Sequence, residues 1–90
     1  MVYFIEIEIH IRREQSNDSF CYIDHYLYDG DKRNVEVAEM ALYDCFAIRD
    51  NRTESITVRV FENTQYRPTE DGLTHVSSYP VYEYTHVPKH

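Results

Sequence analysis

The chain of 90 residues contains no tryptophan, only two glycines and only two cysteines. Neither Gly30 nor Gly72 lies in a G-x-G-x-x-G or G-x-x-x-x-G-K pattern, which excludes nucleotide binding through a loop of that kind. Cys21 and Cys45 each lack a C-x-x-C partner. We therefore expect both to be small buried groups in a reducing compartment rather than the two halves of a disulfide.

Basic residues are also scarce. Nine Lys and Arg stand against sixteen Asp and Glu, giving a net charge of −7. Direct nucleic-acid binding is not expected, because phosphate contacts require a surplus of cations. The charge instead favours basic partners. No segment approaches the roughly 18 apolar residues of a membrane span, and no leader pattern follows Met1, so we expect a cytoplasmic protein without membrane contact.

What the chain does contain is β-alternation. Residues 2–14, 20–28 and 55–62 alternate apolar and polar side chains with the period of two that is typical of strands. Residues 75–87 form a fourth candidate strand, and Pro80 within it predicts an edge position or a bulge. Residues 63–72 are predicted to be a long polar connection.

Between the second and third strands the period changes to that of a helix over residues 35–47. Asn34 is the expected N-cap, and acidic residues occupy the first turns, as the helix dipole prefers. The end of the helix stays open, because 44–49 could instead be extended and pair with the next strand. The apolar positions of the helix are Ala38, Ala41, Leu42, Cys45 and Phe46.

The order ββαββ predicts one α+β domain spanning residues 1–90, a four-stranded antiparallel sheet with one helix packed on one face. We place the odd-numbered residues of the first two strands toward the helix. Like charges directly opposite one another are unfavourable, so we expect Glu8 to face Tyr26 and His10 to face Asp24.

The other face of this sheet would then be uncovered, aromatic and acidic. Tyrosine is enriched at interface cores, although it is also an ordinary strand residue. A stacking platform for single-stranded nucleic acid is less favoured, because basic residues are missing. The predicted partner-binding residues are Phe4, Glu6, Glu8, Tyr22, Asp24, Tyr26, Tyr28 and Phe61, with Tyr82 and Tyr84 as further candidates.

Two of these carboxylates, Glu6 and Glu8, lie about 6.6 to 6.8 Å apart along one strand face, with Asp24 expected nearby. A spaced carboxylate array can imitate a phosphate backbone and occupy a basic groove. The alternative is an ordinary solvated acidic surface.

Catalysis and metal binding are not predicted. Cys21 and His25 lie about 13 Å apart along one strand, too far for a nucleophile and its base. Cys45 near His25 is interpreted as core packing. A metal held by these three residues would need a fourth ligand, and the ligand spacings of zinc sites are missing. No cofactor is expected.

The sequence therefore predicts a small non-enzymatic protein that inhibits a protein partner by occluding its surface, and the partner could be a basic nucleic-acid-binding protein. With nine tyrosines, a net charge of −7 and no motif, the chain resembles the small proteins with which phages inhibit host defence, such as anti-CRISPR and anti-restriction proteins. An alternative is a self-associating module in which Phe4, Tyr22, Tyr26 and Phe61 of two copies bury one another in a homodimer. A small enzyme that uses Cys45 or His25, like a single-stranded nucleic-acid binder, is less favoured than these two hypotheses.

Overall fold

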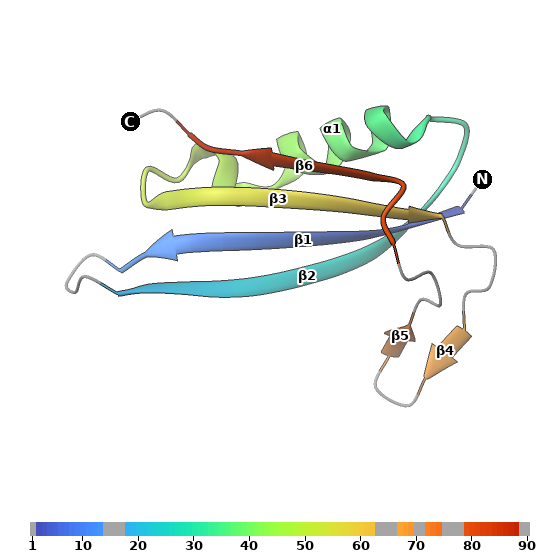
Figure 1. Ribbon diagram of the computed structural model, residues 1–90, viewed down its shortest axis with the longest axis horizontal. Helices are drawn as coiled ribbons and strands as arrows, with labels where there is room; N and C mark the ends of the chain where they lie inside the picture. Colours follow the sequence, from blue (N-terminus) through green and yellow to red (C-terminus); the bar gives the residue numbers. More distant parts are fainter. Residues whose placement is uncertain (1, 14–17, 63–66, 70–71, 75–78, 89–90) are drawn as a thin grey trace.

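A four-stranded sheet with one helix forms the body of the protein. The computed structural model describes residues 2–13, 18–62, 67–69, 72–74 and 79–88. The strands β1 (Val2–Arg12), β2 (Ser19–Asp29), β3 (Thr53–Glu62) and β6 (Tyr82–His86) pair antiparallel in the order β2-β1-β3-β6. The helix α1 (Asn34–Asp44) packs on one face, and a 3₁₀ turn, η1 (Phe46–Arg49), follows it (Figure 1). The α+β class and the predicted sheet with one helix are confirmed.

The two central strands supply most of the core. The odd-numbered residues of β1 from Tyr3 to Ile11 point toward α1 and are almost fully buried, as are Ile56, Val58 and Val60 of β3. Ile5 lies opposite Val60 and Ile9 lies opposite Ile56, so these side chains pack as cross-strand pairs. Full burial of one such side chain contributes about 1.5–3 kcal/mol. From α1 the core receives Val37, Ala38, Ala41 and Leu42.

The pairing of β2 with β1 corrects the predicted register. Glu8 lies opposite Ile23 and His10 lies opposite Cys21, so the even-numbered residues of β2 share a face with the odd-numbered residues of β1. A shift of one residue moves every side chain of a strand to the other face. The tyrosines of β2 therefore lie on the helix side, and Cys21 and His25 lie on the side away from the helix, which we call the open face.

Alternation alone does not distinguish the two faces of β2, because both carry large apolar side chains. Ile23 and Leu27 lie on one face, and Tyr22 and Tyr26 lie on the other. The tyrosine face turns inward because its rings pack against the rim of the core.

The helix differs from the prediction at both ends. Arg33 rather than Asn34 is the N-cap, and Glu36 accepts hydrogen bonds from the Arg33 backbone N–H at 3.4 Å and from its Nε at 3.2 Å. The chain becomes extended at Cys45, with φ −73° and ψ 127°, and then forms η1. The helix thus ends at Asp44, and residues 45–49 neither continue it as an α-helix nor form a strand. Phe46, predicted as an apolar position of the helix, is 64% exposed.

The segment after β3 also differs from the prediction. Within the predicted polar connection and just beyond it lie β4 (Arg67–Thr69) and β5 (Gly72–Thr74), which pair with each other apart from the main sheet (Figure 1). The last strand of the main sheet begins only at Tyr82, and its edge position agrees with the expectation from Pro80. Residues 75–78 of the predicted strand, and 15–17 of the predicted turn, lie outside the described residues.

Candidate functional site

The eight predicted partner-binding residues do not share one face. Their grouping into one surface is wrong, because the register of β2 divides the set into two groups of four. The open face carries Phe4, Glu6, Glu8 and Phe61, and the helix side carries Tyr22, Asp24, Tyr26 and Tyr28. Tyr82 and Tyr84 also lie on the helix side, opposite Val60 and Val58.

A groove runs along the helix side between α1 and β2. We call it the tyrosine groove and define it by Tyr22, Asp24 and Tyr26 of β2 together with Asp44 and Phe46. Its floor is formed by core residues of β1 and α1, and its volume is about 310 Å³. The groove exists because one helix, about 10–12 Å wide with its side chains, cannot cover four strands spaced about 4.8 Å apart.

Aromatic rings form a row that begins in this groove, where Tyr22 and Phe46 line it, and continues beyond the lining residues to Phe20. Tyr22 stacks on Phe46, with ring centroids 5.9 Å apart and planes inclined by 9°, and also on Phe20 at 6.0 Å. The guanidinium of Arg13 lies over the Phe20 ring at 5.3 Å. Phe20 and Phe46 are 40% and 64% exposed, so the row presents substantial apolar area to solvent.

The electrostatics of the groove are acidic. Burial raises the pKa of Tyr26 to about 12, and the charges of Asp44 and Asp24 add to the effect. Burial is also the main reason that the pKa of Tyr22 is raised, with contributions from Cys45, Asp50 and Asp24. The tyrosines therefore remain neutral hydrogen-bonding groups beside carboxylates.

A second, smaller groove lies on the other side of α1. It is formed between α1 and β6 and has a volume of about 190 Å³. Its aromatic side chains are Tyr43, Tyr82 and Tyr84, and Glu39 is its one acidic lining residue. The tyrosines that suggested an interface thus flank the helix on both sides instead of occupying the open face.

The open face carries a charge network centred on Arg59 of β3. The Arg59 Nη1 atom donates to Glu6 at 2.9 Å and to Glu8 at 3.1 Å, and Nε donates to Glu83 at 2.8 Å. Burial opposes the charge of Arg59, but hydrogen bonds with Glu8, Glu83 and Glu6 outweigh it and raise the pKa of the guanidinium. We call these four residues the arginine network.

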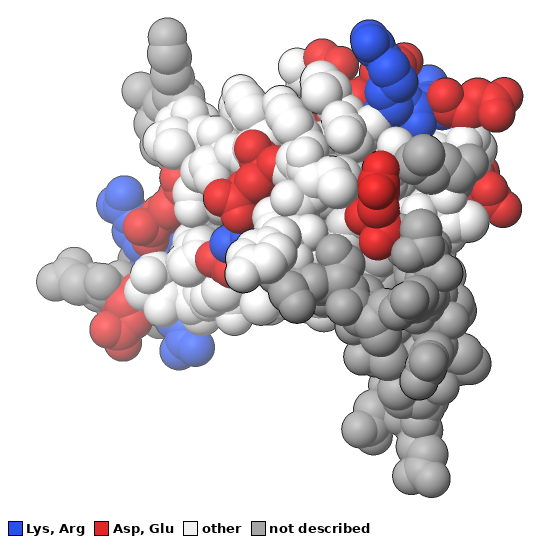
Figure 2. Space-filling view, turned by 45° about the vertical axis from the view of Figure 1, so that its right-hand side comes forward, with Lys and Arg blue, Asp and Glu red and all other residues white. Residues whose placement is uncertain are grey.

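The arginine network also contradicts the predicted array of free carboxylates. Glu6 and Glu8 share one guanidinium, and Asp24 lies on the opposite face of the sheet. Figure 2 shows the acidic side chains on this view as separate groups, divided by uncharged atoms and in places by Lys and Arg. Asp24 is therefore separated from the other two carboxylates, and Glu6 and Glu8 are both paired with Arg59.

Two aromatic residues at one end of the open face are already covered. Phe4 and Phe61 are 2% and 5% exposed, with ring centroids 6.1 Å apart. His25 stacks on Phe4 at 5.2 Å, and its Nε2 lies 3.3 Å from Glu6. Because Phe4 and Phe61 lie on the face opposite Tyr22 and Tyr26, the predicted homodimer surface made of these four residues does not exist.

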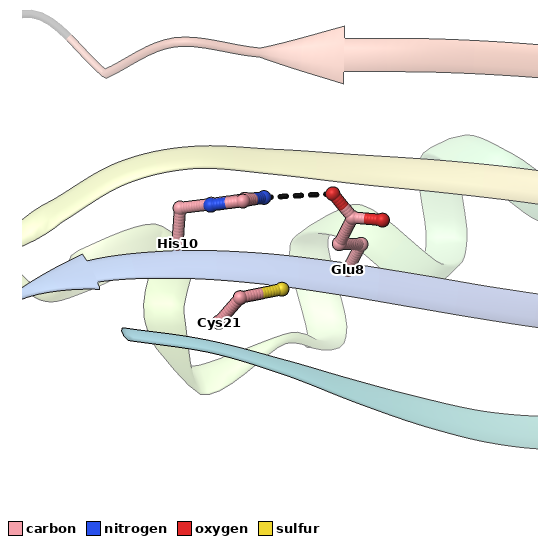
Figure 3. A group of neighbouring side chains, drawn as sticks. All are labelled: Glu8, His10 and Cys21. Carbon is pink, nitrogen blue, oxygen red and sulfur yellow. Dashed lines mark hydrogen bonds and ion pairs between the residues drawn. The ribbon is translucent and has the colours of Figure 1, made fainter. Parts of the chain in front are cut away.

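A cluster of three different side chains, Glu8, His10 and Cys21, shares Glu8 with the arginine network. His10 Nε2 lies 2.7 Å from Glu8 Oε2, and hydrogen bonds with His10 and then Arg59 lower the pKa of Glu8. Cys21 comes from β2 directly opposite His10. Figure 3 shows the three side chains in front of the sheet, with the helix behind it.

Neither cysteine is fully buried as the sequence predicted. Cys21 is exposed on the open face rather than buried, and Cys45 is half-buried beside the tyrosine groove. Cys45 and His25 lie on opposite sides of the sheet, so they do not pack together. Sequence reasoning missed Arg59, His10 and Cys21 as site residues, although His10 and Glu8 alternate on one strand face. The sequence carries no signal for the strand register that brings Cys21 and Arg59 beside these two residues.

Comparison with protein families, with curated proteins and with solved structures finds no match to this chain. Among the residues that the structure describes, no helix is both long enough and apolar enough to cross a membrane.

Proposed function

We propose that this protein is a non-enzymatic inhibitor that binds a protein partner and occludes its surface, with the tyrosine groove as the contact site. The observation that carries the proposal is the exposed aromatic row of Phe20, Tyr22 and Phe46 beside the carboxylates of Asp24 and Asp44. Rigid aromatic side chains are the usual anchors of interfaces.

The row is suited to be an anchor because its geometry exists before binding. Tyr22 is held between the other two rings, and its strand is paired with β1 over eleven residue pairs. Little side-chain freedom is lost when a partner covers such a surface, and this keeps the entropic cost of association low.

The charge of the groove indicates the chemistry of the partner. Asp24 and Asp44 line it, and the whole chain has a net charge of −7. An arginine or lysine side chain fits both features, because its stem packs on aromatic rings while its cationic head meets a carboxylate. The partner surface is therefore basic, as in a protein that binds nucleic acid, and the inhibitor blocks that surface without binding nucleic acid itself.

The biological setting we propose is the one that the sequence profile resembles, a phage-type inhibitor of host defence acting in the cytoplasm. Inhibition rests on an aromatic anchor with acidic neighbours and not on imitation of a phosphate backbone, because Glu6 and Glu8 are engaged with Arg59.

The test compares a groove variant with a matched control on the open face. Proteins retained from a host lysate are compared for the wild type, for Tyr22→Ala with Asp44→Asn, and for Ile23→Ala with Glu83→Gln. We expect a basic nucleic-acid-binding protein to be retained by the wild type and the control but not by the groove variant. The purified partner should then lose nucleic-acid binding when the wild type is added.

Two results would contradict the proposal. One is a partner retained equally by the groove variant, which would place the contact elsewhere. The other is a partner that continues to bind nucleic acid at full occupancy, which would exclude occlusion.

A further inference from the structure

The cluster of Glu8, His10 and Cys21 unites three donor types that zinc accepts. A carboxylate oxygen, an imidazole nitrogen and a thiol sulfur lie within 4.8 Å of one another. Thiolate and imidazole together favour Zn²⁺ over Mg²⁺ or Ca²⁺, which prefer oxygen ligands. From this geometry we infer that Glu8, His10 and Cys21 form a zinc-binding site on the open face, apart from the tyrosine groove.

The distances allow one ion to reach all three donors. Zinc bonds of about 2.0–2.3 Å in tetrahedral geometry place two donors about 3.3–3.8 Å apart. The present contact of 2.7 Å between His10 Nε2 and Glu8 Oε2 has to open slightly, and the thiol has to approach by about 1 Å. Rotations about side-chain bonds achieve both changes without moving the strands.

The backbone holds the site in register. Glu8 and His10 are two residues apart on the same face of β1, and His10 lies directly opposite Cys21 on β2. The pairing of β1 with β2 extends past the site in both directions, from Val2 to Arg12. The separation of the three Cα atoms is therefore fixed by the fold and not by a loop.

Arg59 orients the carboxylate of this site. It binds the Oε1 atom of Glu8 at 3.1 Å, which leaves the Oε2 atom directed at His10. Outer hydrogen bonds of this kind position ligating carboxylates in metal sites. The arginine network also has three carboxylates around one guanidinium, so its excess negative charge favours a cation.

The site has room for a fourth ligand because it is open to solvent. Cys21 is exposed, and the side chains of Glu8 and His10 are 24% and 38% exposed. Water completes the coordination, and the thiol of Cys21 releases its proton to solvent when the ion binds.

The chain itself offers matched controls. Cys45 is the other cysteine and lies on the helix side, and His25 is a second histidine on the open face that binds Glu6. Cobalt(II) is the probe, because a thiolate ligand gives it a charge-transfer absorption band, and displacement by zinc reports the affinity for Zn²⁺. The full chain is used with its cysteines reduced, and circular dichroism verifies the fold of each variant.

We expect one cobalt ion per chain, a thiolate band, and displacement of cobalt by zinc. The band disappears in Cys21→Ser and remains in Cys45→Ser, and affinity falls at least tenfold in His10→Gln but not in His25→Gln. The inference is overturned by the absence of a band in the wild type, by a band that survives Cys21→Ser, or by one that depends on Cys45.

An independent measurement avoids substitution altogether. Bound zinc should slow alkylation of Cys21, while Cys45 in the same chain serves as the internal reference. Equal alkylation of Cys21 with and without zinc would exclude its thiolate as a ligand.

Discussion

The two faces of the sheet are stabilised by different means. Toward α1, aliphatic side chains of β1 and β3 are buried to 6% exposure or less, and dispersion and the hydrophobic effect dominate. On the open face, the same two strands are joined by ion pairs between Arg59, Glu6 and Glu8. The comparison shows that β1 and β3 pair through apolar contacts on the helix side, and on the open face through charge compensation together with the Phe4–Phe61 contact at one end.

The largest expected effect is a loss of stability when a buried side chain on the helix side of the sheet is truncated. Ile56 is fully buried, so Ile56→Ala should lower the free energy of unfolding by about 2–5 kcal/mol through lost contacts and a residual cavity. Ile23 on the open face is 48% exposed, and Ile23→Ala should cost less than about 1 kcal/mol. Urea denaturation measures both, and equal losses would contradict the difference between the faces.

An intermediate loss of stability is expected when the central cation of the arginine network is removed. Arg59→Met leaves three carboxylates without their shared cation and should destabilise the protein by about 1–2 kcal/mol, since the groups are partly exposed. Adding Glu83→Gln should recover part of the loss by reducing repulsion. The control is Arg33→Met, because Arg33 is 86% exposed and solvent screens its pair with Glu36, so we expect a smaller loss of stability than for Arg59→Met.

Urea denaturation could instead show that Arg59→Met lowers the free energy of unfolding no more than Arg33→Met does. The arginine network would then orient its side chains without stabilising the fold. The open face would then be stabilised by its strand pairing and by Phe4 and Phe61.

The smallest expected effect is a dependence on pH within the tyrosine groove. Burial, followed by the charges of Asp44 and Asp24, raises the pKa of Tyr26 from 10.0 to about 12. The unfolded chain loses this proton first as pH rises, so the stabilisation is complete below pH 10 and is lost between pH 10 and 12. Partial exposure limits the change to about 1 kcal/mol.

Tyr26→Phe should remove this part of the pH dependence in unfolding experiments at increasing pH. Tyr43→Phe is the matched control for removal of a tyrosine hydroxyl, because Tyr43 is 65% exposed. A variant at Tyr26 that retained the full dependence would assign it to another group.

The sequence predicted the helix and the strands of the main sheet better than it predicted how neighbouring strands pair. Alternation was sufficient for the faces of β1 and β3, because Ile5, Ile7 and Ile9 contrast with Glu6 and Glu8. It was insufficient for β2, where both faces are apolar and the placement of the odd-numbered residues toward the helix chose the wrong parity. The preference for avoiding Glu8 opposite Asp24 then only chose between two registers of that parity. The pairing puts neither of these residues opposite a charge, so that argument never applied.

The prediction of the C-terminal end of the helix was wrong for a related reason. Cys45 and Phe46 continue the helical period, but the chain leaves the helix after Asp44 and buries Ala47 instead. Thr53 donates a buried hydrogen bond to the carbonyl of Ala47 at 2.7 Å, which ties η1 to β3. A contact between residues six apart that depends on a neighbouring strand leaves no periodic signal in the sequence.

By itself the sequence determined the number of main strands, the single helix, the acidic charge and the inward faces of the central strands, because each follows from local period or composition. Only the tertiary structure decided that the tyrosines flank the helix, that Arg59 forms ion pairs with three carboxylates, and that Cys21 lies opposite His10. These are contacts between strands, and one residue of register, which local propensity does not encode, moves every side chain of a strand to the opposite face.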